Sequence, residues 1–522
     1  KPVFYFPIFF HPDPTVKRQS GFLMPALLSS SVNGSSLKIP YYKVISDDTD
    51  FTVTPRLYFN DDILIQSEFR DVGKNSEHIT DFGVKKTGTD SKSHFFSNTF
   101  SYLELNNFNN SSLEINLEKV SNDTYLKNDK IISEVHENSS FLSSFLNFNA
   151  ERDDLSIAVS VEAYEDLSKV KDSDKYQFVY PNFTVSKLIN TELDLKGDLK
   201  FQISGSRKKS STNIEESFLI NNLNYETIPF FSKLGFKNNF NLLFKNVNKE
   251  GKNSSTHTED TKSENFATLI INSSLPLKKP GRRFNSLLTP KASFRFNPSS
   301  SRELSELDRR ITSVNVFSNN RLGVNDSLEG GQSLTVGAQY DLNNKNSKNL
   351  ATASLAQIFK DVSDKRLPIN STMRDKSSNI IGAIGLIPND YIKFDYDFSL
   401  DNNLKESNYN LFKSTISINN FITSFEFLEE NNEIGSESYL SNETSYTLNN
   451  RNKLLYRERT NRKTDLKEFY NLVYQYKNDC LIAALEYNKD YYSDRDLAPT
   501  EEFFISLTIV PFANAGSPKI SK

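Results

Sequence analysis

Apolar and polar side chains alternate along this chain with a period of two, and helical periodicity is almost absent. Between Leu155 and Val161, leucine, isoleucine and valine occupy every second position. The pattern returns between Tyr391 and Asp401, and in Glu192 to Ile203 it separates apolar from charged residues. The apolar face there would carry Leu193, Leu195, Leu199 and Phe201, and the charged face Asp194, Lys196 and Asp198. Such recurrent alternation predicts an all-β fold.

The lengths of these segments and of their separators bear on the architecture. Each segment has about ten residues, the length that a tilted strand needs to cross a bilayer. Some separators are long and polar, namely Lys169 to Lys175, Ser204 to Asn213 and Glu250 to Glu264, whereas others are short. Long loops at one rim and short turns at the other are typical of outer-membrane barrels. A soluble sheet, solenoid or propeller also alternates, so these stay as alternatives.

The composition fits a membrane barrel. Hydrophobic residues make up only 37% of the 522 positions, yet 41 Phe and 23 Tyr bring the aromatic share to 12%. This balance is expected when only alternate residues face lipid, whereas disordered chains are poor in aromatics. At roughly twenty residues for a strand and its connection, about two dozen strands fit into the chain. We therefore predict one large antiparallel transmembrane β-barrel over residues 21–512.

Several function classes find no support in the residues. No apolar run reaches the roughly 18 residues of a transmembrane helix. Charges of both signs are interspersed around a net charge of -4, which indicates no nucleic-acid surface. There is no phosphate-binding loop, HExxH or GxSxG motif, and the five histidines form no metal pair. We therefore expect neither enzyme activity nor a cofactor or metal, and the charged strand faces would line a solvated lumen or a hydrophilic passage.

Two prolines mark the first two predicted strands. Pro25 and Pro40 lie inside the strand-like segments GFLMPALL and LKIPYY. Proline lacks the N–H that a ladder bond needs, and a closed barrel has no edge strand to accommodate it. The pair therefore predicts a weakly bonded seam where the barrel closes. Alternatively, each proline sits at a bulge or a strand end, which is the interpretation that we prefer for Pro55.

The beginning of the chain has the character of a junction between domains. Residues 1–25 start without Met or a signal peptide, from which we expect a fragment of a longer protein. A short aromatic strand is broken by three prolines, and Lys17 and Arg18 then precede a new strand. This order predicts the last strand of one domain, a rigid turn and the first strand of a larger β domain.

The stretch PVFYFPIFFHPDPTVKRQSGFLMP resembles the junction of the LPS-assembly outer-membrane proteins, the LptD family (also called organic solvent tolerance proteins), above all in its alphaproteobacterial form. Later segments resemble further parts of that family in the right order. They are LKIPYY and TVTPRLYF for the next two strands, NVFSNNRLGVNDSLEGGQSLTVGAQY (Asn315 to Tyr340) for its mid-barrel segment, and IGAIGLIPNDYIKFDYDFSLD and NDCLIAALEYNKDY for later strands. The resemblance spans most of the chain, and the junction is its most specific part.

The resemblance implies a fold and a function. The fold is an antiparallel transmembrane β-barrel of about 26 strands over residues 21–512. The end of a truncated periplasmic β-jellyroll in residues 1–20 would precede it, and a tail in residues 513–522 would follow. The function is that of a translocon in a Gram-negative outer membrane. It receives lipopolysaccharide from a periplasmic bridge and inserts it into the outer leaflet through a lateral gate between first and last strands. In the family, prolines at the places of Pro25 and Pro40 flank that gate.

The implied partners are lipopolysaccharide, membrane lipids, an LptE-like lipoprotein plug inside the barrel, and a periplasmic bridge protein at the N-terminal domain. No nucleic acid is expected. Cys480 matches the family's barrel cysteine, which pairs with a cysteine of the N-terminal domain, but the neighbouring second cysteine is Leu481 here. A buried inert thiol is the alternative. Lys17 and Arg18 would meet lipid phosphates or only snorkel at the periplasmic rim.

Two rival interpretations stand beside this one. The first is a passive or gated outer-membrane pore of another family, which would have no need of the junction and its prolines. The second is a soluble β-rich binding or structural protein.

Overall fold

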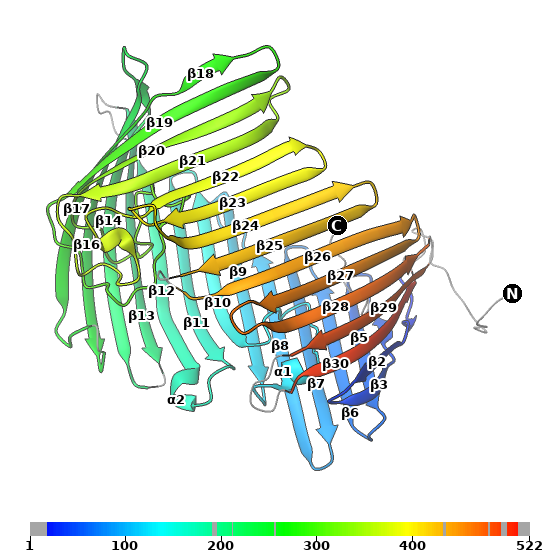
Figure 1. The fold of residues 1–522 in the computed structure, drawn as a ribbon. Coiled ribbons are helices and arrows are strands. Elements are labelled where there is room, and N and C mark those ends of the chain that lie inside the picture. Colours follow the sequence, from blue (N-terminus) through cyan, green and yellow to red (C-terminus); the bar gives the residue numbers. More distant parts are fainter. Residues whose placement is uncertain are drawn as a thin grey trace.

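The computed structural model describes residues 18–190, 196–210, 212–254, 257–431, 435–478, 481–491 and 498–509. Over these residues almost all regular structure is β-strand, and the strands form one sheet in which neighbours run antiparallel. The sheet curves round until β2 (Ala26–Ser30) meets β30 (Thr500–Ile509), which closes a barrel (Figure 1). The predicted all-β fold class is confirmed.

The other strands of the first half are β1 (Gly21–Phe22), β3 (Gly34–Lys38), β4 (Tyr41–Val44), β5 (Thr49–Tyr58), β6 (Ile63–Val72), β7 (Ser76–Thr87), β8 (Asp90–Tyr102), β9 (Asn110–Val120), β10 (Phe141–Arg152), β11 (Leu155–Asp166), β12 (Tyr176–Ile189), β13 (Gly197–Ser210), β14 (Glu215–Thr227), β15 (Phe230–Phe231) and β16 (Lys237–Lys252). Those of the second half are β17 (Lys262–Ser274), β18 (Leu277–Pro280), β19 (Phe284–Asn297), β20 (Gly331–Asn344), β21 (Asn349–Lys360), β22 (Ile380–Asn389), β23 (Ile392–Leu400), β24 (Ser407–Ile418), β25 (Phe421–Glu430), β26 (Ser438–Asn449), β27 (Asn452–Asn461), β28 (Leu466–Lys477) and β29 (Leu481–Asp490).

Four of these 30 segments continue a strand that is interrupted. The two parts of each interrupted strand lie against the same neighbouring strand or strand pair, so we count them as one strand. The four interrupted strands are β1 with β2, β3 with β4, β14 with β15, and β17 with β18. Counted in this way, the described residues form a closed barrel of 26 antiparallel strands. The strand number expected from the family resemblance is thereby confirmed.

The two ends of the barrel differ in their connections. The longest connections of the described chain, residues 121–140, 298–330 and 361–379, lie at the end opposite to the start of β1 and the end of β30. Very short turns, such as residues 390–391 and 419–420, lie at the same end as those strand termini (Figure 1). Outer-membrane barrels have short turns on the periplasmic side and long loops outside. We therefore call the end with the chain termini the inner end and the other the outer end.

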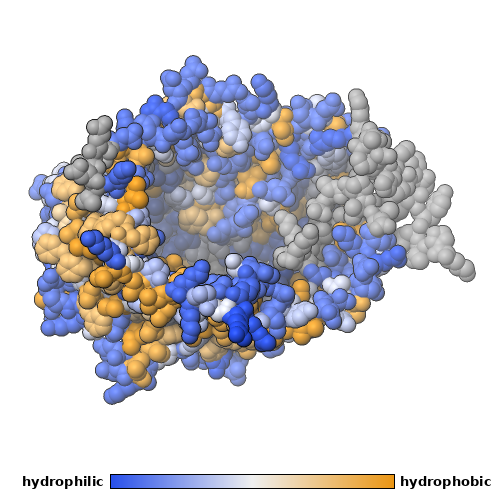
Figure 2. Space-filling model, turned by 90° about the horizontal axis from the view of Figure 1, so that it is seen from above, coloured by the Kyte–Doolittle hydropathy of each residue, from blue (hydrophilic) through white to orange (hydrophobic). Residues whose placement is uncertain are grey.

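The strand faces separate as the alternation predicted. Lys245 of β16 donates from Nζ to the backbone oxygen of Asn325, which belongs to a connection folded inside the barrel, at 2.6 Å. The opposite face of the same strand carries Phe244, whose cross-strand partner Leu223 is in turn paired with Phe201. These three side chains are exposed on the outside. Viewed from above, the molecule is hollow and hydrophilic residues crowd its rim (Figure 2).

The expected outward position of Phe201 is thus confirmed, whereas Leu193, Asp194 and Leu195 lie outside the described residues. One expected separator is mostly wrong, because β13 continues through Ser204 to Ser210. Glu250 to Glu264 does hold a connection, residues 253–261, but the expected bounds also took in the end of β16 and the start of β17. Near the outer end both faces of a strand meet water, so the strand persists after its alternation has faded. Lys169 to Lys175 is a connection, and it holds the short helix α2 (Asp172–Lys175).

Candidate functional site

The first and last strands meet at a junction that we call the seam. β2 pairs with β30 over only five positions, from Ala26–Ser506 to Ser30–Glu502. The other side of β30 pairs with β29 over ten positions, from Leu481–Ile509 to Asp490–Thr500. The first and last strands are thus neighbours, as the predicted closure of the barrel requires. When interrupted strands are counted as one, as in the count of 26, the seam has the shortest ladder between neighbouring strands in the described part of the barrel.

Pro25 and Pro40 lie where the first two strands are interrupted. Pro25 separates β1 from β2, and Pro40 separates β3 from β4. Leu23 donates its backbone N–H to the carbonyl of Pro40 at 2.8 Å, and Ile39 donates to the carbonyl of Pro55 at 3.0 Å. Pro40 and Pro55 thus accept backbone bonds and donate none, as proline must. Each sits at a break in its own strand.

Pro55 differs from our expectation of a bulge or strand end. It lies inside β5, paired with Ile65 of β6 on one side. On its other side it faces the gap between the pairing of β3, which begins at Arg56, and that of β4, which ends at Val53. Together with Pro25 and Pro40 it forms a row across the first three strands. Backbone pairing is therefore missing at neighbouring positions of three adjacent strands next to the seam, and not only at the end of a single strand.

The two ends of the seam are bonded unequally. At the outer end, Ser31 donates its N–H to the carbonyl of Glu501 at 2.9 Å, and Glu501 donates its own N–H to the Ser31 hydroxyl at 3.0 Å. At the inner end, the register would place Met24 opposite Thr508, but no ladder pair forms there, and the short β1 pairs with β4 instead. The buried hydroxyl of Ser506 has no hydrogen-bond partner among the described residues. The seam is closed at the outer end and loosely bonded at the inner end.

The structure describes only part of the predicted junction. Arg18 forms an ion pair with Asp50 of β5 and lies over the ring of Tyr42, 5.7 Å from its centre. Arg18 is thus held against β4 and β5. Its role toward lipid phosphates or at the membrane rim stays a prediction. Lys17 and Cys480, like residues 1–16, lie outside the described residues.

Opposite the seam, a long connection fills part of the lumen. Residues 298–330 fold inward and place Arg321 against Glu329, with Nε and Nη2 donating to one carboxylate oxygen at 2.9 and 2.7 Å. Lys360 of β21 pairs with the second oxygen of Glu329 at 2.7 Å, and all three side chains are almost fully buried. The segment Asn315 to Gly330, expected as part of the mid-barrel segment, therefore belongs to an internal connection. Its strand begins at Gly331.

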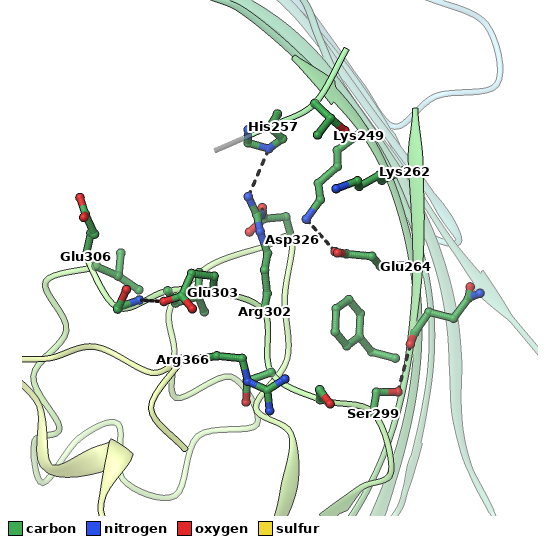
Figure 3. A pocket seen from close by; sticks show the side chains of 18 residues that line it. Lys249, His257, Lys262, Glu264, Ser299, Arg302, Glu303, Glu306, Asp326 and Arg366 are labelled. Carbon is green, nitrogen blue, oxygen red and sulfur yellow. Dashed lines mark hydrogen bonds and ion pairs between the residues drawn. The ribbon is translucent and has the colours of Figure 1, made fainter. Parts of the chain in front are cut away.

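An outer-end cavity of about 1060 Å³ lies between this connection and the ends of β16 and β17. In Figure 3, Arg302 reaches toward His257, with Nη2 3.2 Å from Nε2, and it also forms an ion pair with Asp326. Lys249 pairs with Glu264 at 2.7 Å. Burial, and then the charge of Arg302, lowers the pKa of His257 below its ordinary value. Carboxylates therefore neutralise Lys249 and Arg302 in this cavity. We interpret the cavity as a gap between the inward connection and the barrel wall rather than as a binding site.

The described part of the chain contains no group of three or more His, Cys, Asp or Glu side chains that could hold a metal ion. Neither of its α-helices, α1 (Tyr125–Asn128) and α2, is long and apolar enough to cross a membrane.

Comparison with known proteins gives the family. The family model described as "LptD: LPS transport system D" matches residues 94–462. LPS-assembly protein LptD of Ectopseudomonas mendocina is 42% identical over 76 residues, which cover 15% of this chain and 8% of that protein. LPS-assembly protein LptD of Shewanella frigidimarina is 34% identical over 102 residues, covering 20% and 13%. These alignments thus span a small share of the curated relatives.

Solved barrels are similar only in a general way. The alcaligin outer-membrane receptor FauA of Bordetella pertussis matches 94% of this chain and 76% of its own at 8% identity, with a TM-score of 0.32. The FrpB iron transporter of Neisseria meningitidis matches 94% and 82% at 9% identity, with a TM-score of 0.35. At these scores we draw nothing from them. The family match covers well over half of the chain, it describes a transport family, and together with the barrel it indicates the Gram-negative outer membrane. The chain belongs to the LptD family.

Proposed function

We propose that this chain is the membrane barrel through which a Gram-negative cell delivers lipopolysaccharide to its outer leaflet, and that the seam between β2 and β30 is the lateral exit. Family membership supports the substrate. The observation that carries the exit is the five-position ladder of the seam, bordered at its inner end by Pro25 and Pro40.

The lipid and saccharide parts of such a substrate need different surroundings. Acyl chains would pass between β2 and β30 into the bilayer, since the outward residue Leu27 and its partner Ile505 are apolar. The saccharide would stay in the hydrophilic lumen. A ladder bond is worth about 0.5–1.5 kcal/mol. The donor absent at Pro25 belongs to the strand of β2 itself, and the donor absent at Pro40 belongs to the strand that holds β2 on its other side. The seam is therefore the least costly place to open.

Further parts of the proposal lie beyond the described residues. Residues 1–20 would be the end of a periplasmic β-jellyroll that receives lipopolysaccharide from a bridge protein, and residues 513–522 would be a tail. Cys480 would pair with a cysteine of that N-terminal domain, or remain a buried thiol. A lipoprotein plug of the LptE kind would occupy the lumen between residues 298–330 and the seam, because a barrel of this width leaves an aqueous channel when empty.

Site-specific photocrosslinking in living cells tests substrate and route together. A photoreactive amino acid replaces Met24, at the inner end of the seam, or Leu386, an exposed residue near the inner end of β22. Both lie toward the inner end of the barrel, which the proposed orientation places away from the outer leaflet and its resident lipopolysaccharide. We expect a lipopolysaccharide adduct at Met24 and none at Leu386. Equal labelling at both sites, or none at Met24, would contradict the seam route and favour a passive pore.

A further inference from the structure

Residues 121–140, the connection between β9 and β10 at the outer end, fold inward as a strap over the first strands of the barrel. Its helix α1 buries Tyr125 and Leu126 almost completely. These two side chains belong to an apolar cluster with residues of the barrel wall, namely Tyr58, Leu64, Phe96, Val120, Leu142 and Leu167. Apolar burial of this kind holds the strap against the wall from β5 to β11.

Asp129, just after α1, fixes the strap to the strands nearest the seam. Its Oδ1 accepts the Tyr58 hydroxyl at 2.7 Å and the Lys85 ammonium at 2.6 Å. Its backbone oxygen accepts Nη1 of Arg56 at 2.6 Å, and Arg56 also donates to the Ser36 hydroxyl at 2.9 Å. Charge-assisted bonds of this kind are stronger and geometrically more specific than neutral ones. The strap is therefore a rigid extension of β3, β5 and β7.

From this anchored position the strap reaches both sides of the seam. Asn33, in the turn after β2, donates from Nδ2 to the carbonyl of Asn128 at 2.5 Å. Two residues later, Lys130 Nζ lies 3.5 Å from Oε2 of Glu502 in β30. Glu502 is the ladder partner of Ser30, the last position of the seam. Separating β2 from β30 at the outer end would therefore break the contact between Lys130 and Glu502.

The backbone of Lys130 gives a second, independent indication. Its φ is +49°, in the left-handed region that residues with a Cβ adopt at a cost. Glycine or asparagine would suit that backbone better. Strained backbone of this kind points to a role for the side chain that is held there. The partner carboxylate is well placed for such a role, because only 8% of the Glu502 side chain is exposed.

We propose that residues 121–140 are a strap that holds the outer end of the seam closed. The strap is bound to the β2 side of the seam, and the ion pair between Lys130 and Glu502 connects it to β30. This inference rests on the proposed function for its purpose, because a strap matters only if the seam opens. Its physical content, an ion pair that keeps β2 and β30 together, is independent of the substrate. The prolines make the inner end easy to part, and the strap restrains the outer end.

Lys130→Gly separates the two readings of this contact. If Lys130 only shapes the loop, glycine relieves the left-handed backbone and the seam keeps or gains stability. If Lys130 fastens the seam, glycine loosens it. Hydrogen exchange of the backbone amides of residues 26–30 and 502–506, in the purified full-length protein, measures the difference. We expect exchange in the Lys130→Gly protein to be roughly two- to five-fold faster, as loss of a partly exposed ion pair implies.

Two controls make the test specific. The exchanged pair Lys130→Glu with Glu502→Lys should return the seam amides toward the original rate. Lys489→Gln removes an ion pair of similar length, 3.6 Å to Glu501, that lies between β29 and β30 and does not cross the seam. It should leave the seam amides unchanged. Unchanged or slower exchange in Lys130→Gly would overturn the strap, whereas the crosslinking at Met24 decides the proposed function separately.

Discussion

Two junctions of this barrel have short ladders, and they are supported in opposite ways. The seam joins β2 to β30 over five positions, and β21 joins β22 over six, from Ala351–Leu386 to Ala356–Ile381. By ladder length alone, both would be places to open. The difference lies in which side chains pack against each junction from the lumen.

The β21–β22 junction is covered by the connections that fold into the lumen. An apolar cluster joins this junction to the two connections that span residues 298–330 and 361–379. From the strands it contains Ala356, Ile358 and Ile381, and from the connections Ile311, Val316, Leu322, Leu367 and Met373. An isolated bridge between Phe359 and Ser377 extends the pairing further. The seam has no comparable apolar backing along its length among the described residues; the strap fastens it at the outer end. On the proposed function, a short ladder opens only where no apolar cluster packs across it.

The prolines near the seam also differ from a proline in the distant wall of the barrel. Pro290 lies inside β19, at the gap between β17 and β18, and its carbonyl accepts the N–H of Leu275 at 3.0 Å. Its other side pairs with Ala338 within an unbroken ladder of fourteen positions to β20. One proline thus interrupts one side of one strand. At the seam, Pro25 and Pro40 interrupt two adjacent strands beside the closure, so their effects fall on the same place.

The largest effect should come from removing the backing of the β21–β22 junction. Arg321→Met leaves Glu329 buried with Lys360 alone, and breaking one partner of a buried ionic group costs about 3–5 kcal/mol. We expect residues 298–330 to become protease-sensitive and amides of β21 and β22 to exchange faster. Arg283→Met, in the exposed short turn after β18, should do neither. If Arg321→Met leaves the connection protected, internal backing is not what distinguishes the two junctions.

A smaller effect should come from restoring donors at the seam. In the double variant Pro25→Val with Pro40→Val, each regained ladder bond would contribute about 0.5–1.5 kcal/mol. The donor at position 25 belongs to the strand of β2, and the donor at position 40 strengthens the neighbouring strand that supports β2. We expect slower delivery of newly made lipopolysaccharide to the cell surface, while the barrel stays folded. Pro290→Val is the matched variant at the distant wall and should leave the delivery rate unchanged. Equal delivery rates in the two variants would mean that the prolines do not set the strength of the seam.

Local pattern in the sequence was enough for the strands and the closure. The alternation around Phe201 gave the strand and its outward face, because a period of two belongs to one strand and needs no distant partner. Weak bonding around Pro25 and Pro40 could be predicted for the same reason, since a missing N–H is a property of the residue itself. Their position between strand segments corresponds to the alternative of a strand end rather than to a place inside a strand. The alternation failed at Ser204 to Ser210, where both faces of β13 are polar.

The internal connections could not be predicted in this way. Residues 121–140 and 298–330 have mixed composition and no period, and what fixes them are contacts distant in sequence. Arg321 looks like any loop arginine until Lys360 and Glu329 meet it inside the barrel. Likewise, Lys130 and Glu502 lie near opposite ends of the chain. Only the closure of the barrel brings them together.

The central claim is that β2 parts from β30 while β29 does not, and one cross-linking experiment tests it directly. Ser506 lies opposite Ala26 on one side and Ala484 on the other, and all three are buried. Directly opposed positions of an antiparallel pair are close enough for a disulfide. In a full-length background carrying Cys480→Ser, Ser506→Cys is combined with either Ala26→Cys or Ala484→Cys. Surface lipopolysaccharide is then measured before and after reduction.

The account predicts that the disulfide between positions 26 and 506 abolishes delivery of new lipopolysaccharide to the surface, and that reduction restores it. The disulfide between positions 484 and 506 should leave delivery normal, because that pair of strands stays together throughout. Normal delivery with the bond between positions 26 and 506 fully formed would contradict the account.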